Sequence, residues 1–463
     1  MKLRLRMRWV FALQALLLGV AAWRNLHQLN PDAIAYLRIA GYYSAGQTEL
    51  AITGYWGPLL SWLMVPLLKG GLGPLVAARV VMALSGVVFL AGAVTVFRAF
   101  RLPKPALLAG AVTAAGYSVF WSVRNITPDL LMAGLVGLAV GASMKAFLRP
   151  QRRALPAGLW WGLAYLAKAI ALPLALLTTV LFAALASRGR AELRRELALR
   201  LSLIWLALLL LAGPWMEVIS RHYGKFTFSS TGPIAHALAG PGTESRYHPA
   251  MVTLHRPEPG RLTQWEEPSR MPYRFWSPFS SGENFRHQLS LIGRNVVTLT
   301  EWLWGMRWLS GPADPRKAAQ LLPGFDLLGA SLAGVLSGLA VLLMNRARPR
   351  RVRWTWAVVP VLCLGGLYLP FWVQPEDQRY FYGTLPLVWV LVFGAWGWAC
   401  RQGWQWTREI RMRVFRVVAV AFVIPATLWL AAGIYRIPNP ASDAAVELAG
   451  WLKSAGQNGP LAG

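Results

Sequence analysis

Acidic residues, and charged residues in general, are scarce in this chain. It has 19 aspartates and glutamates against 47 lysines and arginines, and charged residues make up only 14% of its 463 residues. Soluble domains carry about 25% charged residues, so this shortage argues against a water-soluble protein. Cysteine is also nearly absent. Cys363 and Cys400 both lie in apolar stretches, which leaves the intervening loops without a disulfide.

Apolar residues make up 56% of the chain. They form repeated stretches of about 15–23 residues almost without charge, a length that matches the hydrocarbon core of a bilayer. We therefore predict an all-α polytopic membrane protein with about 11 transmembrane helices. The first stretch also has features of a signal peptide, but we expect it to be retained. The predicted spans are 9–26, 75–97, 105–123, 128–147, 154–168, 169–187, 201–219, 322–344, 354–373, 380–400 and 414–434.

The basic residues indicate how these helices are oriented. Of the 47 lysines and arginines, 26 lie in six short segments that contain only three acids. Such clusters stay on the cytoplasmic side of a membrane, which predicts a cytoplasmic N-terminus and a C-terminus outside a bacterial inner (plasma) membrane. No nucleic-acid-binding motif accompanies the net charge of +28, so no nucleic-acid partner is expected. The six segments are 2–8, 98–104, 145–153, 188–200, 346–353 and 401–416.

Two large segments fall outside in this topology. The first, 26–74, includes the apolar stretch 55–68, which is short for a span and contains two prolines. We expect helices lying at the membrane surface there, with Trp56 and Trp62 at the interface. The second, 221–321, is rich in Pro, Gly and Ser and predicts an irregular loop domain. The expected domains are an N-terminal transmembrane module 1–220, the loop domain 221–321, C-terminal helices 322–434 and an outer tail 435–463.

Several common catalytic motifs are absent. Five of the six histidines lie in the second outer segment, but they lack the His-Glu-x-x-His spacing of a zinc site. The sequence also has no Gly-rich phosphate loop ending in Lys-Ser/Thr and no Gly-x-Ser-x-Gly turn. Zinc-dependent chemistry and nucleotide hydrolysis are therefore not predicted.

Two acids lie at the predicted outer ends of helices. Asp32 closely follows the first span, and Asp129 begins the fourth. An ionisable residue at membrane depth is by default a candidate functional residue. A carboxylate in the first turn of a helix also stabilises that helix as a cap or through the dipole. Both interpretations stay open, and function is favoured for Asp32.

Two cations are predicted on the same side. Lys168 lies between two apolar stretches, where a lysine holds a phosphate or extends toward lipid headgroups. Arg379 lies in the turn between the ninth and tenth spans. It can bind a phosphate through two N–H groups or pair with Glu376 or Asp377, and the sequence leaves these alternatives open.

Short motifs follow one another over most of residues 1–400, each on the appropriate side of the predicted membrane. They are Pro31-Asp32, Gly54-Tyr55-Trp56, Thr127-Pro128-Asp129, the segment Gly162–Lys168, Gly213-Pro214-Trp215, and Arg379-Tyr380-Phe381 with Leu385-Pro386. In this order they resemble the C-class (GT-C) glycosyltransferases that use lipid-phosphate sugars, the superfamily of protein O-mannosyltransferases and lipid A aminoarabinose transferases. The chain departs from the family at Ala33, where an acid is common, and at Thr53, where a basic residue is common.

The resemblance implies transfer of a sugar from a polyprenyl-phosphate donor to a lipid, glycan or protein acceptor at the outer face, with inversion at the sugar carbon. A carboxylate can take the acceptor's proton, and cations can stabilise the charge on the departing phosphate. A divalent metal is compatible with this chemistry but not required, because that phosphate is already charged in the donor. The implied site residues are Asp32 and Asp129 as catalytic carboxylates, Lys168 and Arg379 at the donor phosphate, and Tyr36, Tyr55 and Trp56 at the substrate.

Two other classes of protein share some of these features. A transporter or flippase of a lipid-linked saccharide also needs many spans and charged residues within them. Transporters, however, favour internal repeats with interrupted helices, and they do not need an outer segment of this size. A purely structural scaffold explains neither Asp32 nor Lys168. We therefore favour the transferase and keep the transporter as the alternative.

Overall fold

The computed structural model describes residues 2–148, 154–187, 191–242, 248–249, 262–304, 378–381 and 383–390, and the single positions 393, 434, 447, 448, 450, 451 and 454. Every regular element within these residues is a helix. They are α1 (Lys2–Arg24), α2 (Pro31–Ser44), α3 (Thr48–Ala51), α4 (Pro58–Lys69), α5 (Pro74–Ala99), α6 (Lys104–Arg124), α7 (Asp129–Leu148), α8 (Leu155–Ala167), α9 (Ala171–Ser187), η1 (Ala191–Leu193), α10 (Arg194–Tyr223), α11 (Thr231–Leu238), η3 (Pro268–Arg270), α12 (Gly282–Trp304) and η5 (Gln378–Phe381).

The helices have the length and composition of a multi-pass membrane protein. Within the described residues, α5, α6, α7 and α10 are each long and apolar enough to cross a bilayer. The first seven predicted spans each coincide with a helix, namely α1 and α5 to α10. The predicted spans 322–344 and 354–373, nearly all of 414–434 and part of 380–400 lie outside the described residues, as does most of the tail 435–463.

Local sequence explains where several helices begin and end. A proline occupies the first turn of α2, α4 and α5, where its missing N–H costs no hydrogen bond and its fixed φ suits a helix. The helix α10 ends at Gly224, which has φ +65°, a left-handed conformation that glycine adopts without strain. The chain therefore turns sharply at the end of this long helix.

Small residues allow the central helices to pack closely. A Cβ atom on Gly92 of α5 would lie 2.2 Å from the carbonyl oxygen of Gly134 of α7, and one on Gly137 would lie 2.8 Å from the carbonyl carbon of Gly92. Only glycine permits this approach, which is a common means of packing helices in membranes. The helices α5 and α7 thus form the centre of a bundle in which α6 packs on α5 and α8 on α7.

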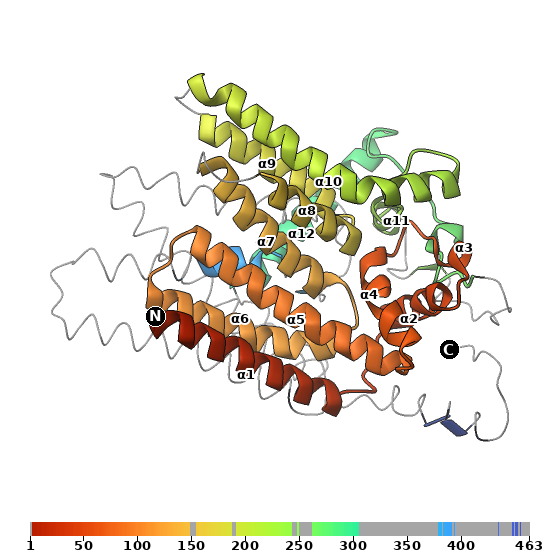
Figure 1. Cartoon of the computed structure of the whole chain (residues 1–463). Coiled ribbons are helices and arrows are strands. Elements are labelled where there is room, and N and C mark those ends of the chain that lie inside the picture. Colours follow the sequence, from red (N-terminus) through yellow and green to blue (C-terminus); the bar gives the residue numbers. More distant parts are fainter. Residues whose placement is uncertain are drawn as a thin grey trace.

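The short helices gather at one end of this bundle. Figure 1 shows α2, α3, α4 and α11 beside the ends of the long helices that are far from the N-terminus. At this end α1, α6 and α8 finish and α5, α7 and α9 begin. The predicted topology puts it outside the cell, so we call it the outer end. The predicted helices of segment 26–74 are confirmed as α2, α3 and α4.

The structure corrects two expectations for the outer segments. Trp56 was expected at the membrane interface but is only 6% exposed, because it packs against Tyr36 and Trp265 and donates its indole N–H to the Trp265 carbonyl. The described part of segment 221–321 is also more helical than an irregular loop, since it contains α11 and the 23-residue α12. Residues buried on one face of α12 recur at helical spacing, which stabilises that helix by packing. They include Gln288, Leu291 and Asn295.

Candidate functional site

Two ion pairs join four charged residues from separate parts of the chain. Asp32, in the first turn of α2, pairs with Arg379 of η5. Asp129, the first residue of α7, pairs with Lys168, which follows α8 directly. Arg379 also lies close enough to interact electrostatically with Asp129. The structure thus brings together all four charged residues that the sequence predicted for the site.

The aromatic ring of Tyr380 connects the two ion pairs. The Lys168 Nζ lies 4.7 Å from the centre of this ring, and the Arg379 guanidinium carbon lies 5.4 Å from it. Both cations are therefore within the range of a cation–π interaction with the same side chain. An anion that approached this ring would meet two positive groups at once.

The two carboxylates differ in their access to solvent. The side chain of Asp129 is 2% exposed, whereas that of Asp32 is 19% exposed. The partly exposed carboxylate can meet a hydroxyl group of a substrate, and the buried one cannot without rearrangement. Lys168, at 20%, and Arg379, at 14%, are also partly accessible. Asp129 is thus held against Lys168, and Asp32 is the more accessible of the two carboxylates.

A buried arginine ties together the two segments that carry these carboxylates. Arg79 of α5 is 2% exposed and donates to the carbonyl oxygens of Gln28 and, at 3.0 Å, of Val123. Close by, the Ile126 N–H donates to the Asn30 side-chain oxygen at 2.8 Å. Gln28 and Asn30 precede Asp32, and Val123 and Ile126 precede Asp129, so these contacts hold the two segments together just before the site begins.

Tyrosine and tryptophan side chains line the site next to Asp32. The ring of Trp56 lies 5.2 Å from that of Tyr36 and 4.7 Å from that of Tyr55, edge to face in both cases. Burial raises the pKa of both tyrosines well above the ordinary value, and the negative charge of Asp32 raises it further. Both phenols therefore stay protonated. Tyr36 and Trp56 are 4% and 6% exposed, so in this structure they pack behind Asp32, and their contact with a substrate stays a prediction.

The second outer segment supplies residues that the sequence did not single out for the site. The Tyr55 hydroxyl lies 3.2 Å from His248 Nε2, and His248 Nδ1 lies 2.5 Å from the Tyr273 hydroxyl. Burial lowers the pKa of His248 to about 4, against the opposing effect of Asp32. The neighbouring acids Glu266 and Glu267 are each 1% exposed. The sequence signal for Glu266 and Glu267 was the presence of two adjacent acids in so basic a chain. No periodic pattern surrounds them, so the sequence did not predict their position.

Among the described residues, the charged groups of the site do not form a set of metal ligands. Hard divalent cations prefer several oxygen ligands, but Asp32 and Asp129 each face a cationic side chain. Within the described ranges, no group of three His, Cys, Asp or Glu side chains gathers as metal ligands would. The positive charge at this site comes from Lys168 and Arg379.

Comparison with solved structures identifies the fold. The archaeal oligosaccharyltransferase AglB from Archaeoglobus fulgidus, in complex with an inhibitory peptide and a dolichol-phosphate, aligns over 96% of this chain with a TM-score of 0.53 and 14% identity. Its apo form aligns over 98% with a TM-score of 0.52 and 12% identity. The chain spans 59% and 58% of the lengths of these two structures.

A second type of transferase is also similar. ArnT from Cupriavidus metallidurans, bound to undecaprenyl phosphate, aligns over 95% of this chain and 90% of its own, with a TM-score of 0.37 and 18% identity. No protein-family profile and no curated protein sequence matches. The chain thus shares its fold with the membrane oligosaccharyltransferase AglB.

Proposed function

We propose that this chain is an integral-membrane glycosyltransferase that moves a sugar from a polyprenyl-phosphate donor to a lipid, glycan or protein acceptor at the outer face. The observation that supports this most directly is the convergence of Asp32, Asp129, Lys168 and Arg379 at one end of the bundle. The fold adds support, because AglB has a solved structure that contains dolichol-phosphate. Charges of both signs at the end of apolar helices suit a lipid-linked, phosphate-bearing donor.

Lys168 and Arg379 are the donor-phosphate ligands in this proposal. The planar guanidinium of Arg379 matches two phosphate oxygens, and Lys168 contributes a compact point charge. Asp129 keeps Lys168 in place, and the Tyr380 ring lies against both cations. Charges that are positioned before the reaction stabilise the phosphate as it departs.

Asp32 is the general base. The acceptor hydroxyl attacks the anomeric carbon of the sugar, and the bond between that carbon and the phosphate oxygen breaks. The polyprenyl phosphate keeps the bonding electrons and leaves as an anion, and the proton of the hydroxyl moves to Asp32. Base catalysis of this kind contributes roughly 10²–10⁴-fold. A single displacement inverts the configuration of the anomeric carbon.

The ion pair between Asp32 and Arg379 fits an order in which the donor binds before Asp32 acts as a base. In the structure the Arg379 guanidinium occupies the Asp32 carboxylate, so an acceptor hydroxyl has to compete with it for that carboxylate. A donor phosphate offers Arg379 a better, bidentate partner. In our proposal the donor therefore draws Arg379 away from Asp32, and the base becomes available only when a donor is bound.

The experiment compares cells with and without the gene for their glycosylated lipids and proteins. The missing product defines the acceptor, and complementation with Asp32→Asn then tests the base. We expect this variant to fold, because the N-cap of α2 is Asn30 and not Asp32 and asparagine has nearly the size and shape of aspartate, but to give no product, because an amide cannot accept the proton. The matched control is Glu49→Gln, which changes an exposed acid in the first turn of α3 in the same outer segment.

The outcomes separate the two classes of protein. Full product formation by Asp32→Asn at the native rate would show that Asp32 is not the base. A transporter gives a different result. Loss of its gene changes the side of the membrane on which a lipid-linked saccharide is found. No sugar linkage is missing once that saccharide again reaches the enzymes that use it.

A further inference from the structure

The segment 262–273 of the second outer loop lies across α2, the helix that carries Asp32. Its residues Glu266 and Glu267 are adjacent in sequence and each 1% exposed. Buried carboxylates are costly unless they are paired. Their partners therefore identify the parts of the structure to which this segment binds.

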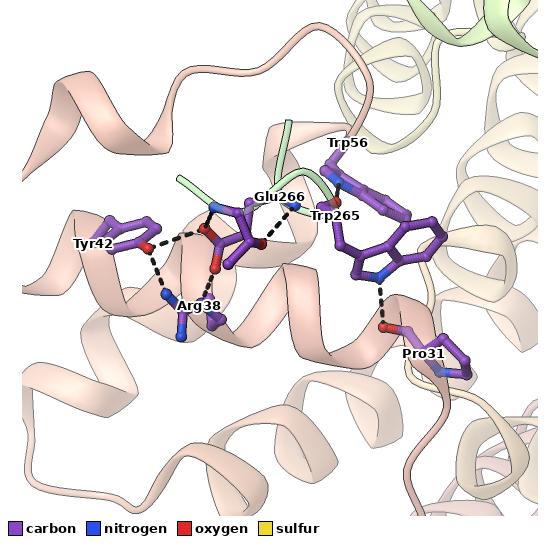
Figure 2. A network of polar contacts seen from close by, with 7 residues as sticks. Pro31, Arg38, Tyr42, Trp56, Trp265 and Glu266 are labelled. Carbon is purple, nitrogen blue, oxygen red and sulfur yellow. Dashed lines mark hydrogen bonds and ion pairs between the residues drawn. The ribbon is translucent and has the colours of Figure 1, made fainter. Parts of the chain in front are cut away.

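Glu266 binds the middle of α2. Its carboxylate forms an ion pair with Arg38 and accepts a hydrogen bond from the Tyr42 hydroxyl at 3.0 Å. Arg38 in turn donates to the Tyr42 hydroxyl at 2.9 Å, and the Thr263 N–H donates to Glu266 at 2.9 Å. Figure 2 shows this closed set of contacts between α2 and the loop segment. Glu266 thus attaches the loop to α2 and also bonds to the loop's own backbone at Thr263.

Trp265 binds the beginning of the same helix. Its indole N–H donates at 2.9 Å to the carbonyl of Pro31, the residue immediately before Asp32. The Trp265 carbonyl accepts from the Trp56 indole N–H, also at 2.9 Å. Figure 2 shows Trp265 between Trp56 and Pro31, with Glu266 next to it. One loop segment therefore holds α2 at two points, on either side of Asp32 along the chain.

Glu267 makes a third attachment, to the other parts of the site. It accepts hydrogen bonds of 3.0 Å from the Tyr223 hydroxyl at the end of α10. That hydroxyl also accepts the Gly54 N–H at 2.9 Å, next to Tyr55. The three consecutive residues thus connect α2, the segment with Tyr55 and Trp56, and the outer end of α10.

We propose that Trp265, Glu266 and Glu267 form a latch that fixes the first turn of α2, so that the second outer loop supplies positioning residues for Asp32. This inference rests on the proposed function, because it assumes that the position of Asp32 matters for transfer. The three residues act on Asp32 through the backbone of Pro31 and through Arg38. The site is complete only when the outer loop is docked.

The latch predicts a specific kinetic pattern. Trp265→Phe keeps the ring but removes the N–H donor to Pro31, and Glu266→Gln and Arg38→Met each remove one charge of the pair. We expect kcat to fall about ten- to a hundredfold in each, because a small misplacement of a catalytic group has that effect. The donor KM should change much less, since Lys168 and Arg379 are untouched. Arg38→Lys keeps the charge and should restore most of the rate.

A double-mutant cycle tests whether Arg38 and Glu266 act as one unit. The double variant Arg38→Met with Glu266→Gln should lose no more activity than the worse single variant. The matched control is the exposed ion pair of Glu217 and Arg221 on α10, whose side chains are 60% and 80% exposed. Changing both of these to glutamine should leave kcat unchanged.

A second measurement does not depend on transfer. Hydrogen exchange of the α2 amides 33–37 is measured in the full chain in detergent. It should become faster in Trp265→Phe, Glu266→Gln and Arg38→Met, which we call the latch variants. It should stay unchanged in the control at Glu217 and Arg221. Normal kcat together with wild-type exchange in folded latch variants would overturn the proposal. A chain without any transfer activity would refute the proposed function alone, and exchange in α2 would still decide whether the latch exists.

Discussion

Gly57 lies directly against the backbone carbonyl of Ala167. A Cβ atom at Gly57 would come within 2.2 Å of that oxygen, so no other residue fits without movement. Gly57 follows Tyr55 and Trp56, and Ala167 precedes Lys168. This contact therefore fixes how the aromatic side of the site meets the residue that we assign to the donor phosphate.

We predict that Gly57→Ala lowers both stability and donor binding. The added methyl group forces the two segments apart, and overpacking of this kind costs about 1–3 kcal/mol. Lys168 should move with its backbone. Thermal unfolding in detergent and titration with undecaprenyl phosphate measure the two effects.

Gly73→Ala is the matched control. Gly73, like Gly57, caps the N-terminus of a helix before a proline, and their φ angles are −63° and −61°. Gly73 has no other atom within 4 Å of where its Cβ would lie. A Gly57→Ala protein as stable as the Gly73→Ala protein, with equal phosphate affinity, would show that the contact does not position Lys168.

The assignment of Lys168 and Arg379 predicts a change in donor affinity. Lys168→Ala and Arg379→Ala should each weaken binding of undecaprenyl phosphate by roughly ten- to a hundredfold, because each removes a charged hydrogen-bond donor worth about 1.5–3 kcal/mol. Lys69→Ala is the control, since this exposed lysine at the end of α4 can reach headgroups but lies outside the proposed phosphate site. Unchanged affinity in folded Lys168→Ala and Arg379→Ala proteins would favour lipid contact and local ion pairing.

The identity of the charged residues could be predicted from the sequence, but their pairing could not. Asp32 and Asp129 were recognisable because acids are rare at the ends of apolar stretches. Arg379 had acids nearby in sequence, yet the structure pairs it with Asp32, 347 positions away. Only the packing of α2 beside η5 creates that pair, and no local pattern encodes it.

The contribution of the second outer loop was harder to predict. Its site residues are held by a few contacts with distant segments, such as the hydrogen bond from Trp265 to the Pro31 carbonyl and the ion pair of Glu266 with Arg38. Such contacts leave no periodic pattern in a sequence rich in Pro, Gly and Ser. Membrane helices, by contrast, repeat an apolar pattern for the length of a span, so α5, α6 and α7 were placed almost to the residue.

The predicted topology is testable by cysteine labelling. Single cysteines at Ser281, before α12, and at Ser187, at the end of α9, should react from opposite sides of the membrane in a chain whose two native cysteines are replaced by alanine. The seven crossings predicted before residue 224 require this result if the N-terminus is cytoplasmic. Labelling of both positions from one side would invalidate the topology and, with it, transfer at the outer face.

The burial of His248 predicts that the folded chain loses stability in acid. Its ring faces the hydroxyls of Tyr55 and Tyr273 and the ring of Trp265, with Asp32 near enough to interact electrostatically. Burial lowers its pKa from an ordinary 6.5 to about 4. Between these two pH values the unfolded chain binds a proton that the folded chain does not, so the free energy of unfolding falls as the pH falls.

The expected decrease in the free energy of unfolding from the protonation of His248 is roughly 2 kcal/mol between pH 7 and pH 5. His248→Gln keeps hydrogen-bonding groups but does not titrate, so the thermal midpoint of this variant should fall less than that of the wild type over the same range. His222→Gln, at an exposed position at the end of α10, is the control and should follow the wild type. If the wild type, His248→Gln and His222→Gln proteins lose stability in parallel, the pKa of His248 is the same in the folded and the unfolded chain, and burial does not lower it.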